Sequence, residues 1–215
     1  MIKIKHSAII ILLIIVQSVS AQQHEINSES LVKLLDGNLR FTSGSSIHGN
    51  QSLDRVKEVV KGQHPFAIIV GCSDSRVPPE VVFDQGVGDL FVIRTAGNLV
   101  DDIALGSIEY AVEHLHVPLI MVLGHEKCGA VDAALQGGEA PGQIQKLIDK
   151  IKPAVDATAS LPGDKLDNAV IDNIKRIVDQ LKHSKPIIEE FLHHKKINIV
   201  GARYDLDEGK VTLVD

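Results

Sequence analysis

Short apolar runs alternate with segments of helical periodicity along most of the chain. Runs rich in β-branched residues predict strands at 66–70, 90–93, 119–123, 197–200 and 211–214. The first four are almost continuously apolar, which is typical of strands covered on both faces, and the last fits a strand at an edge. Helical patterns in the gaps indicate βαβ units. We therefore expect an α/β fold: a central, mostly parallel β-sheet of four to five strands, flanked by helices and preceded by an N-terminal helical arm.

Apolar positions recur at the helical period between these strands. Asp101 and Asp102 precede such a pattern at 103–115 and can cap the helix that it predicts. The same periodicity predicts helices at 166–181 and 186–192 and, ahead of the first strand, at 31–41 and 53–60. Two segments rich in Gly, Pro, Ser and Ala predict loops at 137–142 and 157–164.

The first 21 residues have the pattern of a secretory signal peptide. Lys3 and Lys5 give a positive start, an apolar run fills 8–16, and small residues at 19–21 offer a cleavage site before Gln22. Nine apolar residues span about 14 Å as a helix, half of a ~30 Å hydrocarbon core, which makes a permanent membrane span the weaker interpretation. We expect 1–21 to be a signal peptide and 22–215 to be one domain, exported to a periplasm or beyond, with no stable membrane span after processing near Ala21–Gln22.

Composition narrows the class of protein further. The 215 residues are 44% hydrophobic and 23% charged, which is ordinary for a globular domain. With five Phe, two Tyr and no Trp, the core must be aliphatic. The net charge of −6 gives a nucleic-acid partner no electrostatic support, and two cysteines exclude a disulfide-rich scaffold.

Residues able to bind a metal follow two of the predicted strands. The first strand runs into Cys72, and the third runs into His125 and Cys128. Ligands of open parallel sheets bind beyond the carboxyl ends of strands, where the strand order reverses. If these two strands are neighbours, the three side chains converge. Two thiolates and one imidazole suit Zn²⁺, and three protein ligands leave the open position typical of a catalytic site.

Asp74 and Arg76 lie close to Cys72 in the sequence. The carboxylate of Asp74 could have either of two roles. Asp74 could bind the metal as a fourth ligand and close the site. Paired with Arg76, it would instead stay ionised and accept a hydrogen bond from a zinc-bound hydroxide. Three other interpretations remain open at this point: a Cys72–Cys128 disulfide, a structural zinc site, and a plain surface ion pair of Asp74 and Arg76.

The motif Cys72-Ser73-Asp74-Ser75-Arg76 followed by His125-x-x-Cys128-Gly129 resembles the β-class carbonic anhydrases. The likeness extends over 30–214 and includes the segments 38–41, 88–98, 106–112 and 199–201. The resemblance implies zinc-dependent, reversible hydration of CO2 to bicarbonate and a proton, with one Zn²⁺ per subunit held by Cys72, His125 and Cys128. It also implies that Asp74 accepts the hydrogen bond from the hydroxide and that Arg76 fixes Asp74.

The resemblance further implies a substrate pocket and an assembly. Gln63 matches a glutamine that some relatives use to bind substrate, and the backbone N–H of Gly129 would lie near the substrate. Phe91 and Tyr110 match pocket-wall residues that a dimer partner contributes in relatives, so a homodimer or homotetramer is expected. Some members bind regulatory bicarbonate through a Trp just before the first zinc cysteine; Ile69 stands there, so we do not expect that control.

Two other functions remain open from the sequence. The same scaffold could hydrolyse CS2 or COS, which share the linear shape and electrophilic carbon of CO2. A zinc- or redox-responsive binding protein with a closed site would have Asp74 on the metal or a disulfide between the cysteines.

Overall fold

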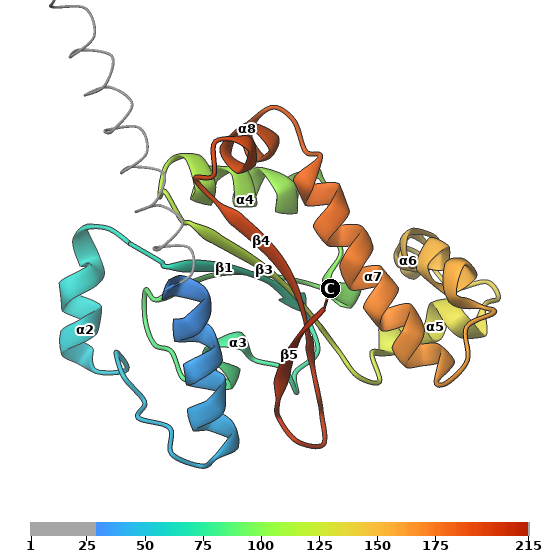
Figure 1. The fold of residues 1–215 in the computed structure, drawn as a ribbon, viewed down its shortest axis with the longest axis horizontal. Helices are drawn as coiled ribbons and strands as arrows, with labels where there is room; N and C mark the ends of the chain where they lie inside the picture. The colour runs from blue at the N-terminus through green and yellow to red at the C-terminus, as the bar shows by residue number, and fades with distance from the viewer. Residues whose placement is uncertain (1–28, 215) are drawn as a thin grey trace, which may run out of the picture.

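A five-stranded sheet in the order β2-β1-β3-β4-β5 forms the centre of the molecule (Figure 1). The computed structural model describes residues 29–214, so the predicted signal peptide lies outside the described residues. The strands are β1 (Ala67–Cys72), β2 (Leu90–Thr95), β3 (Leu119–His125), β4 (Asn198–Tyr204) and β5 (Val211–Val214). The first four are parallel and β5 is antiparallel to β4. The predicted α/β class and mostly parallel sheet are confirmed.

Helices connect and cover these strands. They are a helix at 29–42, α2 (Leu53–Glu58), α3 (Pro79–Val82), α4 (Asp102–Glu113), α5 (Gly129–Gln136), α6 (Ile144–Thr158), α7 (Lys165–Lys182) and α8 (Ile187–His193), with 3-10 turns η1 (Val59–Lys61) and η2 (Ala96–Asn98). Asp101 caps α4 as predicted, because its carboxylate accepts the Ala104 N–H at 2.8 Å. The loop predicted at 157–164 is wrong in its first residues, since α6 continues to Thr158, whose buried hydroxyl donates to the Ala154 carbonyl.

Alternate residues of β1 and β3 face two different apolar layers. Ile68 and Ile120 pack against buried residues of α4 to α8, whereas Ile69 and Met121 pack against the helix at 29–42 and α3. Figure 1 shows α4 to α8 on one side of the sheet and the N-terminal segments on the other. The prediction of strands covered on both faces therefore holds for β1 and β3. It is wrong for β2, which is only partly buried because it lies at the edge of the sheet.

The strand order reverses between β1 and β3. From β1 the chain continues to β2 on one side, and from β2 it returns to β3 on the other. Both strands are parallel, so their carboxyl ends, Cys72 and His125, lie at the same edge of the sheet. This edge is the position at which such sheets bind ligands.

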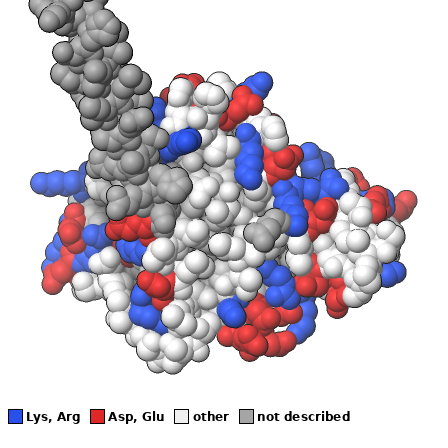
Figure 2. Space-filling model, in the orientation of Figure 1, with Lys and Arg blue, Asp and Glu red and all other residues white. Residues whose placement is uncertain are grey.

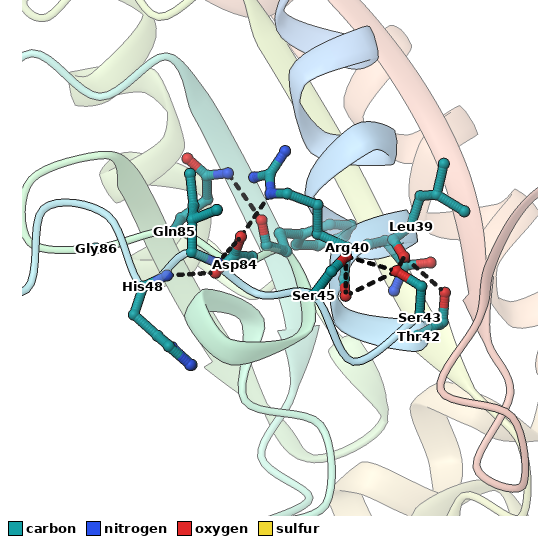
Figure 3. Close-up of polar contacts among 12 residues, drawn as sticks. Leu39, Arg40, Thr42, Ser43, Ser45, His48, Asp84, Gln85 and Gly86 are labelled. Atoms are coloured by element: carbon teal, nitrogen blue, oxygen red, sulfur yellow. Dashed lines mark hydrogen bonds and ion pairs between the residues drawn. The ribbon is translucent and has the colours of Figure 1, made fainter.

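A buried carboxylate in the turn after α3 holds the N-terminal segment in place (Figure 3). The side chain of Asp84 is 0% exposed and accepts hydrogen bonds from Arg40 at 2.6 Å and from the Ile47 and His48 amides at 3.1 and 3.0 Å. Burial alone would raise the pKa of Asp84, but these hydrogen bonds outweigh it and hold the pKa below its ordinary value. Asp84 therefore stabilises the fold above its unfolded-state pKa, and this contribution is lost as the pH falls through the folded-state pKa.

We predict that Arg40→Met lowers the free energy of unfolding at pH 7 by about 1–3 kcal/mol, because it leaves a buried carboxylate without its cation. Urea unfolding at fixed protein concentration measures the loss. The difference from wild type should narrow as the solution is acidified below the ordinary Asp pKa of about 3.9. Lys57→Met is the matched control, because Lys57 and Asp54 are 76% and 90% exposed and their ion pair should contribute at most about 1 kcal/mol. Equal losses in both variants would contradict the role of Asp84.

Candidate metal centre

The structure brings the three predicted ligands together at the reversal of strand order. Cys72 is the last residue of β1, His125 is the last residue of β3, and Cys128 stands directly before α5. They are 5%, 0% and 2% exposed. One ring nitrogen of His125 and the two sulfurs lie within 4.8 Å of one another. The cysteines are free thiols with their Sγ atoms 4.0 Å apart, well beyond the ~2.05 Å of a disulfide bond.

The hydrogen bonds of His125 identify the nitrogen available to a metal. Its Nδ1 lies 2.7 Å from the Glu126 carbonyl oxygen, which can only accept, so Nδ1 carries the proton. In the neutral ring, Nε2 then presents a lone pair. Burial opposes protonation of the ring, but the adjacent Cys72 outweighs it and raises the pKa of His125. Nε2 is one of two buried side-chain nitrogen or oxygen atoms within residues 29–214 that have no hydrogen-bond partner. Buried polar atoms are rarely left unpartnered, and a neutral imidazole beside two thiols is the donor set that Zn²⁺ prefers.

The two sulfurs have opposite pKa shifts because they share a proton. A hydrogen bond from Cys128 lowers the pKa of Cys72 to about 4 against the effect of burial, and the Gly97 N–H at 3.3 Å adds to this stabilisation. The hydrogen bond to Cys72 and burial both raise the pKa of Cys128. A divalent cation placed between the sulfurs would bring the second thiol to its thiolate form as well. The donor set therefore fits zinc in charge and in chemistry.

Asp74 is held beside the three ligands by Arg76. Arg76 donates from Nε to Oδ1 at 2.9 Å and from Nη2 to Oδ2 at 2.7 Å, and its backbone N–H donates to Oδ1 at 2.9 Å. The side-chain hydrogen bond from Arg76 holds the pKa of Asp74 well below its ordinary range, against the effect of burial. Oδ2 of Asp74 lies 3.7 Å from Nε2 of His125. Asp74 is thus ionised and directed toward the ligands, while its own oxygens are bound by Arg76.

Two residues that stabilise this site were not predicted for that role. Arg94 on β2 donates to the carbonyl oxygen of Cys72 at 2.8 Å and to that of Asp74, so it fixes the backbone of the loop. The sequence indicated Arg94 only as part of the segment 88–98. Gly97 donates to Cys72 from a backbone with φ of 68°, where a Cβ would lie 2.8 Å from the Ile151 side chain. A glycine two residues after the end of β2 was the available signal for Gly97.

The predicted pocket residues do not all lie near these ligands in one chain. Gly129 follows Cys128 and begins α5, beside the metal-binding group. Gln63 precedes β1, and Phe91 pairs with Ile68, so both lie toward the amino ends of the strands. Cys72 is four residues beyond Ile68 along β1, or about 13 Å at a strand rise of ~3.3 Å per residue. Tyr110 lies near the carboxyl end of α4, half exposed and in contact with His114.

Comparison with known proteins places this geometry in a family. A family model described as carbonic anhydrase matches residues 67–211, which include all three ligands. A carbonic anhydrase from Mycolicibacterium smegmatis is 41% identical over 184 residues, covering 84% of this chain and 89% of the relative. Carbonic anhydrase 2 from Mycobacterium tuberculosis is 42% identical over 186 residues, covering 85% and 90%. The chain belongs to the β-carbonic anhydrase family.

Solved β-carbonic anhydrases share the fold. One of two tetrameric enzymes from Sordaria macrospora superposes with a TM-score of 0.70 at 27% identity, covering 74% of this chain and 85% of that one. The Coccomyxa enzyme, in complex with acetazolamide, gives a TM-score of 0.69 at 31% identity and covers 74% and 75%. The predicted family and enzyme class, a carbonate dehydratase, are thereby confirmed. No helix within residues 29–214 is both long and apolar enough to cross a membrane.

We predict that Cys128→Ser abolishes stoichiometric zinc binding, because a neutral hydroxyl replaces a thiolate in a three-residue donor set. Metal analysis after dialysis against limiting Zn²⁺ measures the loss. His183→Ala, which removes an exposed histidine at the carboxyl-terminal cap of α7, should bind as much zinc as wild type and serves as the control. Zinc retained at the wild-type stoichiometry by Cys128→Ser would show that the metal binds elsewhere.

Proposed function

We propose that this carbonic anhydrase catalyses the reversible hydration of CO2 to bicarbonate and a proton in a zinc-dependent reaction. One observation supports zinc dependence above the others: Cys72, His125 and Cys128 present two sulfurs and an unpartnered Nε2 to a common point in the protein interior. Asp74 is bound by Arg76 rather than standing among these donors. This arrangement favours an open, catalytic site over a closed structural one.

Zinc supplies the nucleophile in this proposal: when bound, it lowers the pKa of a coordinated water to about 7, a value established on a carbonic anhydrase. The protein must then bring CO2 to that point and orient the attack. CO2 is small, uncharged and apolar, so it needs an apolar slot rather than a charged clamp.

Asp74 has the charge and the position to orient the nucleophile. Its Oδ1 accepts two hydrogen bonds from Arg76, whereas Oδ2 accepts one and keeps a lone pair on the side of His125. That lone pair can accept a hydrogen bond from the O–H of the attacking group. The hydrogen bond orients the attacking oxygen so that its own lone pair faces the carbon of CO2. An ionised Asp74 can only accept, so it holds the attacking group with its O–H directed toward Asp74. Arg76 keeps Asp74 ionised and prevents it from turning onto the metal.

We propose that a second copy of the chain completes the substrate pocket. Gln63, Phe91 and Tyr110 lie away from Cys72 within one chain, so they can serve this pocket only across an interface. Several large apolar side chains near the N-terminus are exposed by half or more: Val32 52%, Leu39 66%, Ile47 68%, Leu53 78% and Val60 76%. Figure 2 shows a broad area with few charged groups across the centre of the visible face. The tetrameric Sordaria relative supports assembly of this kind.

We also propose export, with 1–21 as a signal peptide that is removed near Ala21–Gln22 and a periplasmic or secreted mature enzyme. The positive start, apolar run and small residues before Gln22 support this localisation.

We predict that Asp74→Asn lowers kcat for CO2 hydration by about 100-fold or more while zinc content stays at the wild-type level. The loss follows because an amide can donate as well as accept and no longer holds Arg76; removing one fixed catalytic hydrogen bond typically costs about 10²–10³ in rate. Stopped-flow hydration with parallel metal analysis measures both quantities. Asp207→Asn is the control, since Asp207 is exposed and pairs with Lys127 outside the proposed chemistry. Hydration by Asp74→Asn within about threefold of wild type would exclude this role.

We predict that Leu39→Glu shifts the protein toward monomer and lowers hydration activity without loss of zinc, because a charge is placed in an apolar interface. Analytical ultracentrifugation and metal analysis measure the two effects. Leu161→Glu, at a 48% exposed leucine after α6, should leave assembly unchanged. A fully active monomer would show that one chain contains the whole pocket.

A further inference from the structure

The turn that follows the ligand His125 is strained, and it is anchored through side chains. Glu126 and Lys127 form this turn between β3 and Cys128. Lys127 has φ of 50°, in the left-handed region that non-glycine residues adopt at a cost. The orientation of the peptide between these residues determines where the Glu126 carbonyl points. That carbonyl accepts the Nδ1 proton of His125 and so sets which ring nitrogen faces the metal.

Arg203 on β4 is the main anchor of Glu126. Its Nη2 donates to Oε1 of Glu126 at 2.7 Å, and both side chains are 19% exposed. The other carboxylate oxygen, Oε2, accepts the Leu206 N–H at 3.1 Å, and the Glu126 N–H donates to the Tyr204 carbonyl at 3.0 Å. Glu126 is therefore held through its side chain and its backbone by the hairpin of β4 and β5.

Arg203 is fixed in turn by α7. Its Nε donates to Oδ1 of Asp167 at 2.6 Å, and its Nη1 lies 3.6 Å from Oδ2 of Asp205. The planar guanidinium can bind these acids at once because its donors point in different directions, which a lysine ammonium cannot reproduce. Glu126 and Asp205 thus have Arg203 as their cationic partner, and Asp207 has Lys127 at 2.9 Å, so the protein itself balances the charge of all three acids.

We propose that Arg203, acting through Glu126, is a positioning residue that sets the orientation and tautomer of the zinc ligand His125. The inference rests on the proposed zinc dependence and extends it beyond the ligands themselves. Residues that orient a metal-bound histidine typically change metal affinity 10–100-fold when they are removed. The neighbouring Lys127–Asp207 pair is 57% and 76% exposed, so it can replace little of this anchoring.

The experiment compares zinc release from zinc-loaded variants in the presence of excess chelator. Arg203→Met should release zinc about 10- to 100-fold faster than wild type, and Arg203→Lys should be intermediate. Glu126→Gln should release zinc faster too, and the double variant should be no faster than Arg203→Met, because both changes remove the same interaction. Arg176→Met is the control, since Arg176 pairs with Asp172 on α7 away from the turn and should leave zinc release unchanged.

A second readout distinguishes positioning from general stability. The ring Nδ1–H of His125 should exchange with solvent faster in zinc-loaded Arg203→Met than in wild type, as measured by ¹⁵N NMR. If Arg203→Met lowers the urea midpoint but leaves zinc release within twofold of wild type and this exchange unchanged, Arg203 is only structural and the inference falls while the proposed function stands. If wild type itself binds no zinc, both are wrong.

Discussion

Two thiols and an imidazole are enclosed at one end of a sheet, and the fold leaves one of their donor atoms without a partner. Nε2 of His125 cannot be satisfied by the Glu126 carbonyl, which occupies Nδ1, and it lies beside the two sulfurs without a hydrogen-bond partner. A divalent cation resolves this arrangement by accepting three electron pairs at once and by compensating the charge of two thiolates. Cys72 and His125 are the last residues of the adjacent strands β1 and β3, so a metal bound to both would link the ends of these strands.

The charges around this centre are arranged in two separate systems. Arg76 binds Asp74 and keeps it ionised but away from the metal position, while Arg94 fixes the backbone of Cys72 and Asp74 from the neighbouring strand. On the other side, Arg203 and Glu126 act on the turn after His125. Each arginine binds oxygen atoms of the protein, so none of them competes with zinc for the ligands. A site of this kind needs the surrounding arginines as much as its three ligands, because thiolate and imidazole donors bind well only when they are held in position.

The sequence predicted the sheet and the ligands because both are encoded locally. Continuous apolar runs identify strands covered on both faces, and Cys72 and His125 directly follow two of them. β1, β2 and β3 each run two residues beyond their apolar runs, and in β1 and β3 the last of these residues is a predicted metal ligand. β4 runs four residues further because Ala202 and Tyr204 continue the core. The helix α6 was not predicted: Pro153 and a mixed composition obscure its periodicity, and it forms because Ile151 and Val155 pack against the core of the domain.

The roles of Arg94 and Arg203 depend on contacts across strands and helices, which no local pattern encodes. Gln63, Phe91 and Tyr110 lie away from Cys72 within one chain, and their place in the pocket rests on the proposed assembly, which the pattern of one chain does not specify.

X-ray absorption at the zinc edge of the purified, zinc-replete protein near neutral pH tests the central claim most directly. The account predicts two sulfur neighbours at about 2.3 Å and two nitrogen or oxygen neighbours at about 2.0–2.1 Å, one of them from His125. A zinc edge that shows only nitrogen or oxygen neighbours and no sulfur would contradict it.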